Sequence, residues 1–218
     1  MKVLSAMPDA ILTPPPVDYS ELAPRLADGP ISLLDFGAQW SEIEIEVGYG
    51  RGMFLIQRAQ QVPHHLVLGF EVKKKLAYRV DERRKRLQLH NARAYFGDVR
   101  DVLPRITSTG QVGRIFMHFP DPWWKKRHGK RRLVGDTLLN EVARLLRPGG
   151  EFFLQTDVEE RAAVHAECVA EHPAFVLGAD MGRIADNPYG AVSNREKRAV
   201  EDGLPVYRVL ARRRAGTF

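Results

Sequence analysis

The strongest constraint on the fold is a regular alternation of apolar runs and longer amphipathic or charged segments, which begins at residue 42. The apolar runs predict strands at residues 43–47, 66–70, 92–96, 113–119 and 151–156. The intervening patterns predict helices at residues 52–62, 73–89, 133–147 and 158–171. Strands that alternate with helices are joined by right-handed crossovers, so we expect an α/β fold with a mainly parallel sheet covered on both faces.

The two ends of the chain depart from this alternation. Residues 1–30 contain six prolines, which remove backbone donors, so we expect an extended arm there and one large domain over residues 31–218. The chain after residue 171 is less regular. Residues 178–203 are expected to be one long irregular stretch, typical of a functional loop, and residues 206–211 a late strand.

The charge balance favours an anionic partner. The chain has 33 Lys and Arg against 27 Asp and Glu, a formal net charge of +6. The cations cluster in residues 73–86, 125–132 and 212–214. We interpret those of the 73–89 helix mainly as a solvated face, with direct contact to nucleic acid as the alternative.

The composition also bears on location. Cys168 is the only cysteine, which excludes an internal disulfide and indicates a reducing compartment. No apolar stretch is adequate for a secretory signal or long enough to span a membrane. We therefore expect a cytoplasmic enzyme or binding protein without a membrane partner.

A glycine-rich turn follows the first strand, in Glu46-Val47-Gly48-Tyr49-Gly50-Arg51-Gly52. Glycines at this place let a ligand approach the backbone, although a structural turn has the same composition. A dinucleotide fingerprint needs a glycine at position 53, which is Met, so the turn does not favour a pyrophosphate.

Two further acids follow the next two strands. Glu71 stands where a carboxylate accepts hydrogen bonds from ribose hydroxyls, and Asp98 stands near where an adenine amine would donate. With Glu46, three acids at successive strand ends suit a cofactor that carries ribose and positive charge but no phosphate. S-adenosylmethionine meets that description.

Residues 120–132 follow the 113–119 strand and combine one carboxylate, two indole rings and six Lys or Arg. Asp121 is therefore expected at a strand's carboxyl end, where open α/β sheets hold their ligands. An acid beside a cationic loop suggests chemistry on a polyanion, whereas an aspartate in Pro-Asp-Pro also commonly caps a turn. Either Trp123 or Trp124 could stack on a base, with the other packing the loop.

The chain resembles the bacterial tRNA (guanine-N7)-methyltransferase family of class I methyltransferases from about Phe36 to about Arg198. The resemblance is most specific over residues 120–132, which are similar to the family's Pro-Asp-Pro-Trp stretch with its following Lys, Arg-His and Lys-Arg-Arg. The other motifs occur in the family's order: Glu46 with its glycines, Phe70-Glu71-Val72, Gly97-Asp98, and Pro148-Gly149-Gly150 followed by Thr156-Asp157.

The resemblance implies a Rossmann-like, doubly wound sheet of seven mainly parallel strands, and methyl transfer from S-adenosylmethionine to guanine N7 in tRNA, at position 46 in the variable loop. It implies that Asp121 is catalytic and that the cofactor is bound by Glu46, Gly48, Gly50, Gly52, Glu71, Asp98 and Asp121. The target nucleotide would meet Lys125, Asp157, Ser193, Asn194, Arg195 and Glu196. The tRNA backbone would lie along Arg127, His128, Gly129, Lys130, Arg131 and Arg132.

One segment departs from the family pattern. The family's late Thr-Lys-Phe-Glu motif corresponds to Ser193-Asn194-Arg195-Glu196, which keeps only the hydroxyl and the acid, and the family glycine that follows is Ala199.

Guanine N7 carries an in-plane lone pair and no proton, so methyl transfer to it needs no strong general base. Catalysis then depends on holding N7, the methyl carbon and sulfur in line. Because the methylated ring becomes cationic, we expect Asp121 to orient the guanine or stabilise that charge rather than remove a proton.

Two other functions fit these residues: an RNA methyltransferase with a different target, and a noncatalytic RNA-binding homologue. A zinc site of His165, Cys168 and His172 lacks a fourth ligand at a usual spacing, so we expect no metal. The pattern implies no protein partner and leaves open a monomer or a homodimer.

Overall fold

The computed structural model describes residues 17–120 and 134–216, which form a seven-stranded sheet with the order β3-β2-β1-β4-β5-β7-β6. The strands are β1 (Glu42–Val47), β2 (His65–Glu71), β3 (Ala92–Phe96), β4 (Val112–His118), β5 (Leu146–Thr156), β6 (Phe175–Leu177) and β7 (Tyr207–Arg213). The first five are paired in parallel, and β7 runs antiparallel to both of its neighbours. The predicted α/β fold with a mainly parallel seven-stranded sheet is confirmed.

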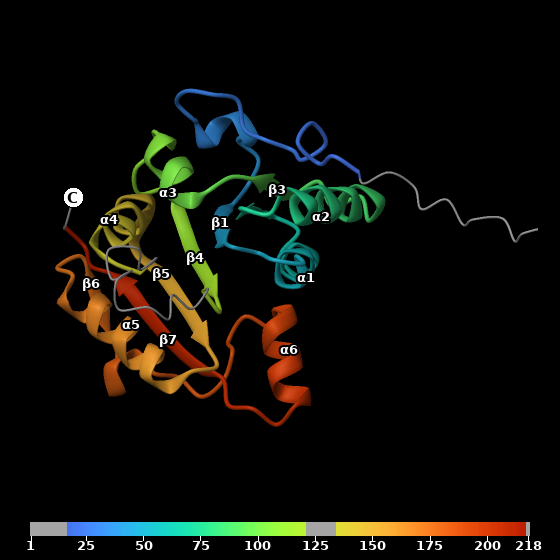
Figure 1. Ribbon diagram of the computed structural model, residues 1–218. Helices are drawn as coiled ribbons and strands as arrows, with labels where there is room; N and C mark the ends of the chain where they lie inside the picture. Colours follow the sequence, from blue (N-terminus) through green and yellow to red (C-terminus); the bar gives the residue numbers. More distant parts are fainter. Residues whose placement is uncertain (1–16, 121–133, 217–218) are drawn as a thin grey trace, which may run out of the picture.

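Helices cover both faces of this sheet (Figure 1). The α-helices are α1 (Met53–Gln61), α2 (Lys74–Arg86), α3 (Val99–Val102), α4 (Asp136–Leu145), α5 (Glu159–Glu171) and α6 (Asn194–Glu201). Short 3-10 turns are η1 (Leu33–Phe36), η2 (Leu103–Arg105) and η4 (Asp180–Gly182). In Figure 1, α4 and α5 lie on one side of the strands and α1, α2 and α6 on the other. No helix within the described ranges has the length and apolar character needed to cross a membrane.

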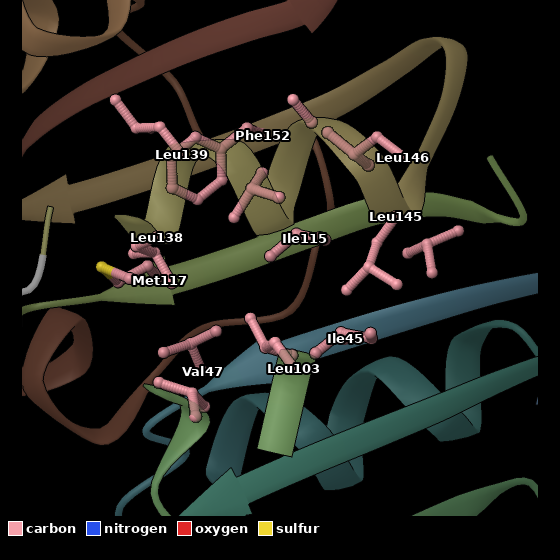
Figure 2. Packing of buried hydrophobic residues seen from close by; sticks show 14 of the residues in the cluster. Ile45, Val47, Leu103, Ile115, Met117, Leu138, Leu139, Leu145, Leu146 and Phe152 are labelled. Carbon is pink, nitrogen blue, oxygen red and sulfur yellow. The ribbon is translucent and has the colours of Figure 1, made fainter. Parts of the chain in front are cut away.

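The main core lies between the sheet and α4, as Figure 2 shows. Leu139 of α4 is fully buried against the β4 and β5 side chains Ile115 and Phe152, which have no exposed surface. Each such side chain contributes about 1.5–3 kcal/mol by its burial. The alternate residues of the same strands point to the opposite face, where Phe54, Phe116, Phe153 and Tyr189 form a separate aromatic cluster.

A buried ion-pair network crosses this opposite face near the amino ends of the strands. Glu44 of β1 has no exposed surface and bonds Arg58 of α1 through two contacts of 2.7 Å. Arg114 of β4 and His65 of β2 each lie 3.0 Å from the same carboxylate. Burial by itself raises the pKa of the Glu44 carboxyl, but the Arg58 hydrogen bonds and charge outweigh it and hold the pKa below its usual range.

The described part of the predicted arm packs on the edge of the sheet. Ala23 is buried, and the backbone N–H of Phe96, at the end of β3, donates to the Pro24 carbonyl at 2.7 Å. Arg105 Nε donates to the Gly29 carbonyl at 2.8 Å. Residues 17–30 therefore contact the outer strand β3 and the turn after α3.

Two boundaries differ from the sequence prediction. The helix expected to end at Arg147 ends at Leu145, because Leu146 is buried and already pairs with Val112 as the first residue of β5. The Pro148-Gly149-Gly150 segment is therefore part of a strand rather than a helix terminus, with Gly149 at φ 74°.

The prediction of one irregular stretch over 178–203 was wrong for its last part. Helix α6 begins there at Asn194, and the hydroxyl of Ser193 caps it by accepting from the Glu196 N–H at 3.1 Å. This Ser-x-x-Glu spacing is a capping signature, which the sequence analysis attributed to substrate binding alone. The three-residue strand β6 was also missed.

Candidate functional site

The candidate site lies where the parallel strands β1, β2 and β3 end side by side. Gly48, Gly50 and Gly52 all adopt positive φ, at 70°, 55° and 67°, which disfavours any other residue. Among the described residues, a Cβ atom at Gly48 or Gly50 would have no neighbour within 4 Å, whereas one at Gly52 would lie 2.5 Å from Val80 of α2. The first two glycines thus leave open space for a ligand, and the third permits close helix packing.

Glu71 holds this glycine turn in place. Its carboxylate accepts from the Gly50 N–H and from the Lys73 N–H, each at 2.9 Å. Because each carboxylate oxygen accepts more than one hydrogen bond, Glu71 can still bind a ligand hydroxyl. The residue is 7% exposed, at the place that the sequence predicts for a ribose contact.

Glu46, at the end of β1, is paired with a residue that the sequence analysis did not select. His118 of β4 lies with Nδ1 3.0 Å from Glu46 Oε1, and both side chains are almost fully buried. In the described part of the chain, neither Glu46 Oε2 nor His118 Nε2 has a hydrogen-bond partner. The same is true of both amide atoms of Gln155, whose backbone pairs with His118 on the neighbouring strand β5.

Buried polar atoms without partners are rare in native proteins and are commonly satisfied by a ligand or an ordered water. The row Glu46, His118 and Gln155 crosses the carboxyl ends of β1, β4 and β5 on one face of the sheet. The Glu46 oxygen that has no partner in the part of the chain described by the structure is therefore available to a cationic group bound at this edge.

Asp98 follows β3 and caps the short helix α3. Its carboxylate accepts from the Arg100 N–H at 3.0 Å and forms an ion pair with the Arg100 guanidinium. The Arg100 hydrogen bonds hold the pKa of Asp98 below its usual range, against the effect of partial burial. The side chain is 24% exposed, so it remains accessible to a ligand amine, in competition with Arg100.

Tyr49, within the glycine turn, anchors this turn to β3, a role that the sequence analysis missed. Its ring is buried, and its hydroxyl donates to the Tyr95 carbonyl of β3 at 3.1 Å. Burial, followed by the nearby charges of Glu71 and Glu46, raises the pKa of the Tyr49 hydroxyl. The sequence signal for this role was an aromatic residue between two glycines, in Gly48-Tyr49-Gly50.

The chain leaves β4 in a strained conformation. Phe119 has φ 49°, which is uncommon for a bulky residue, and it precedes Pro120, which further restricts its backbone. Such conformations cost about 1–3 kcal/mol and cluster at functional sites. The strained residue lies two positions before Asp121 in the sequence.

Asp157 and Arg195, two of the predicted substrate residues, come together although they lie 38 positions apart. Arg195 Nε donates to Asp157 Oδ2 at 3.0 Å, and the Arg195 side chain is 55% exposed. Asn194 is also exposed beside it at the start of α6. These groups lie at the surface after β5, where a large substrate can reach them.

Glu196 and Ser193 have different surroundings, because both are buried. The Glu196 carboxylate accepts from Arg208 Nη2 of β7 at 2.9 Å and from Asn187 Nδ2 at 3.1 Å. Ser193 caps α6, and Gln57 of α1 accepts from the neighbouring Val192 N–H at 2.9 Å. In this structure the two residues anchor the segment before α6 and do not face solvent.

The remaining predicted residues lie outside the described part of the chain. They are the catalytic candidate Asp121, the substrate candidate Lys125, and the RNA-binding candidates Arg127, His128, Gly129, Lys130, Arg131 and Arg132, together with Trp123 and Trp124.

Across residues 17–120 and 134–216, no group of three or more His, Cys, Asp or Glu side chains could hold a metal ion. His172 has a ring nitrogen 3.0 Å from Asn140 Oδ1, and its Nδ1 accepts from the Ala174 N–H at 3.3 Å. Burial, followed by the charge of Arg161, lowers the pKa of His165 to about 4. The surroundings of His165 and His172 are therefore those of side chains packed within the fold.

Comparison with known proteins assigns the chain to a family. A family described as "Putative methyltransferase" matches residues 41–209. The tRNA (guanine-N(7)-)-methyltransferase of Synechococcus sp. (strain JA-3-3Ab) is 38% identical over 79% of this chain and 72% of that protein. The chain belongs to the tRNA (guanine-N7)-methyltransferase family. The corresponding protein of Synechocystis sp. (strain ATCC 27184 / PCC 6803 / Kazusa) is 36% identical over 78% of this chain and 82% of its own length.

Solved structures agree on the fold of this family member. TrmN from Thermus thermophilus superposes with a TM-score of 0.58 at 21% identity, over 83% of this chain and 47% of that one. The 16S rRNA methyltransferase KamB superposes with a TM-score of 0.52 at 17% identity, over 83% of this chain and 91% of that one. The class I methyltransferase fold and the family, both predicted from the sequence, are therefore confirmed.

Proposed function

We propose that this chain is an S-adenosylmethionine-dependent tRNA (guanine-N7)-methyltransferase that modifies the guanine at tRNA position 46. Membership of that family supports the reaction and the tRNA substrate. The observation that carries the proposal is the row of acids Glu46, Glu71 and Asp98 at the ends of three adjacent strands, around a glycine turn that is open at Gly48 and Gly50.

The residues present fit S-adenosylmethionine. The buried Glu46 oxygen, which has no partner within residues 17–120 and 134–216, suits the cationic methionine end of the cofactor, because an unpaired buried charge is costly. Glu71 is placed to accept from the ribose hydroxyls and Asp98 from the adenine amine. No phosphate has to be bound, which agrees with a turn whose one cation, Arg51, is exposed.

S-adenosylmethionine supplies an electrophilic methyl group on a positively charged sulfur. The chain's contribution is to hold guanine N7 in line with that methyl group, a positioning effect worth up to about 7–11 kcal/mol. We assign the positioning of the guanine to Asp121, which would accept from its N1–H and amino group and stabilise the positive charge that develops on the ring. The exposed Arg195 and its partner Asp157, which is partly buried, would meet the target nucleotide, and the cations of residues 125–132 would meet the phosphates.

The decisive experiment is to incubate the purified protein with labelled S-adenosylmethionine and unmodified tRNA, digest the tRNA, and identify the labelled nucleoside. We expect 7-methylguanosine, lost when the guanine at position 46 is replaced. A different labelled nucleoside or position would support the alternative of another RNA target. Cofactor binding without transfer would support a noncatalytic homologue.

A second variant tests the assignment of Asp121. Asp121→Asn should reduce turnover far more than affinity for S-adenosylmethionine, because the residue is assigned to the guanine. Equal losses in both would instead indicate a role in cofactor binding.

The single Cys168 and a tRNA substrate together support a cytoplasmic location for this activity.

A further inference from the structure

One face of α2 carries four cations that have no acidic partner in the described residues. Lys75, Arg79, Arg83 and Arg86 are all exposed, and their spacing of three or four positions puts them on one side of the helix. We call these four residues the α2 ridge. The two acids of α2 are used elsewhere: Asp81 pairs with Arg84 and Lys85, at 2.6 and 2.8 Å, and Glu82 pairs with Lys85 at 3.0 Å.

The arrangement works against the stability of α2. Like charges at a spacing of four residues are destabilising by about 0.2–0.5 kcal/mol per pair, and Lys75, Arg79 and Arg83 form two such pairs. The first turn of α2 contains no acid, and the N-cap Lys73 makes no side-chain capping bond. Cations there oppose the helix dipole, which favours them only near the C-terminus, at Arg83 and Arg86. The helix dipole therefore accounts for the cations in the last turn of α2 but not for Lys75 in the first turn.

The ridge begins beside the candidate site and is held firmly. Lys73 N–H donates to Glu71, so the first turn of α2 lies at the same edge of the sheet as the glycine turn. The inner side of α2 is fixed by the buried residues Ala77 and Val80. From Lys75 to Arg86 the helix rises about 17 Å. In Figure 1, α2 lies at the outer flank of the molecule, beside β3.

We propose that the α2 ridge is an RNA-binding surface, which contacts the phosphates of the bound tRNA outside the segment that contains the target guanine. The inference rests on the proposed function. Exposed guanidinium groups bind phosphate through paired hydrogen bonds, and Arg79, Arg83 and Arg86 supply three of them in a row. These contacts carry no sequence information and fix the position of the RNA on the protein. An RNA strand along the ridge also relieves the repulsion within α2.

The test compares two triple variants with the same net charge. The ridge variant is Lys75→Gln, Arg79→Gln and Arg83→Gln. The control is Lys85→Gln, Arg147→Gln and Arg212→Gln, whose side chains are more than half exposed but each bonded to a carboxylate. Affinity for unmodified tRNA is measured for wild type and both variants across a salt series, together with S-adenosylmethionine affinity, turnover at saturating tRNA and the melting temperature.

We expect the ridge variant to bind tRNA at least tenfold more weakly than the control. Its slope of log affinity against log salt should be shallower by about 2–3, since each lost phosphate contact contributes about 0.7–0.9. Cofactor affinity and saturated turnover should be unchanged, and the melting temperature should be equal or higher. Equal affinities and equal salt slopes for the two variants would overturn the proposal. Failure of the wild type to methylate tRNA would contradict the proposed function instead, and the binding series would still decide the role of the ridge.

Discussion

At the scale of single residues, Glu46 combines a stabilising contact with an unused one. One oxygen is held by His118, and the other is buried without a partner in the described residues. A buried carboxylate in this state destabilises the unliganded protein, and the binding of a cation beside it is therefore favourable.

Replacing Glu46 by Gln should therefore separate binding from stability. The amide can still bond His118 but carries no charge, so we expect S-adenosylmethionine affinity to fall by roughly tenfold or more while the melting temperature stays the same or rises. Calorimetric titration and thermal unfolding measure the two effects. Asp101→Asn, an exposed acid of α3, is the matched control for the loss of one negative charge. Unchanged cofactor affinity in Glu46→Gln would refute the assignment.

Replacing Asp157 should affect tRNA kinetics more than stability, whereas replacing Arg208 should affect stability. Arg195 is 55% exposed and Asp157 17%, so solvent still screens the pair, and Asp157→Asn should change the free energy of unfolding by no more than about 1 kcal/mol. It should reduce kcat/KM for tRNA by roughly 10- to 100-fold, the size expected for a lost charged hydrogen bond. Cofactor affinity should not change.

Arg208→Met is the contrasting variant. It leaves the buried Glu196 carboxylate without its cation, which should cost about 3 kcal/mol in urea unfolding. An Arg208→Met protein as stable as the wild type would contradict the structural role of Arg208. An Asp157→Asn protein with normal tRNA kinetics would contradict the assignment of Asp157 to the substrate.

The sequence identified the acids of the site because each lies at the end of a predicted strand or just after it. It could not identify their partners. His118 lies 72 positions from Glu46, and only the register between β1 and β4 brings them together. Likewise, no local signal joins Glu196 to Arg208. The two residues meet only because the antiparallel strand β7 runs beside β5 and brings Arg208 to the start of α6.

At the scale of the elements, α5 contains a pH-sensitive position. Burial and Arg161 lower the pKa of His165 to about 4, whereas an unfolded histidine titrates near 6.5. Between these values the unfolded chain binds more protons than the folded one, so stability falls as the pH decreases from about 6.5 toward 4.

We therefore expect His165 to account for about 2 kcal/mol of stability lost between pH 7 and pH 5. Urea unfolding at the two pH values should show a smaller loss in His165→Leu than in the wild type. His90, an exposed histidine outside α5, provides the control through His90→Gln, which should keep the full pH dependence. An identical pH dependence in wild type and His165→Leu would contradict this account.

The elements themselves were largely predictable. Strands β2 and β4 and the second half of β5 are buried on both faces, which gives the apolar runs that the sequence shows. Strand β1 was predictable from its β-branched residues, although glutamates alternate with them. The misplaced elements have weaker signals. Helix α6 is mostly polar and recognisable only by its cap, β6 has three residues, and the end of α4 depends on a strand pairing formed by Leu146.

At the scale of the whole molecule, Arg58 connects distant parts of the chain. It bonds Glu44 of β1 and donates to the Tyr189 carbonyl at 3.3 Å, so it joins the first strand, α1 and the segment that leads to α6. The half of the fold that holds the cofactor turn and the half that holds Arg195 are tied by this residue and by Gln57.

Replacing Arg58 by Met should lower the free energy of unfolding by about 2–3 kcal/mol, at the small end for a broken buried pair because Arg114 and His65 still contact Glu44. The double variant Glu44→Gln, Arg58→Met should recover part of that loss, since no buried charge is left unpaired. Chemical denaturation of the two single variants and the double variant measures the coupling. Strict additivity would show that the pair is not a unit.

The hydrogen bond from Phe96 to Pro24 has a consequence for handling the protein. Strand β3 is an outer strand of the sheet, and such a strand offers unpaired backbone groups to any other extended chain. Residues 17–30 shield part of that border. A chain shortened to begin after Pro30 would expose it, and should aggregate on concentration or storage under conditions in which the 218-residue chain stays dispersed.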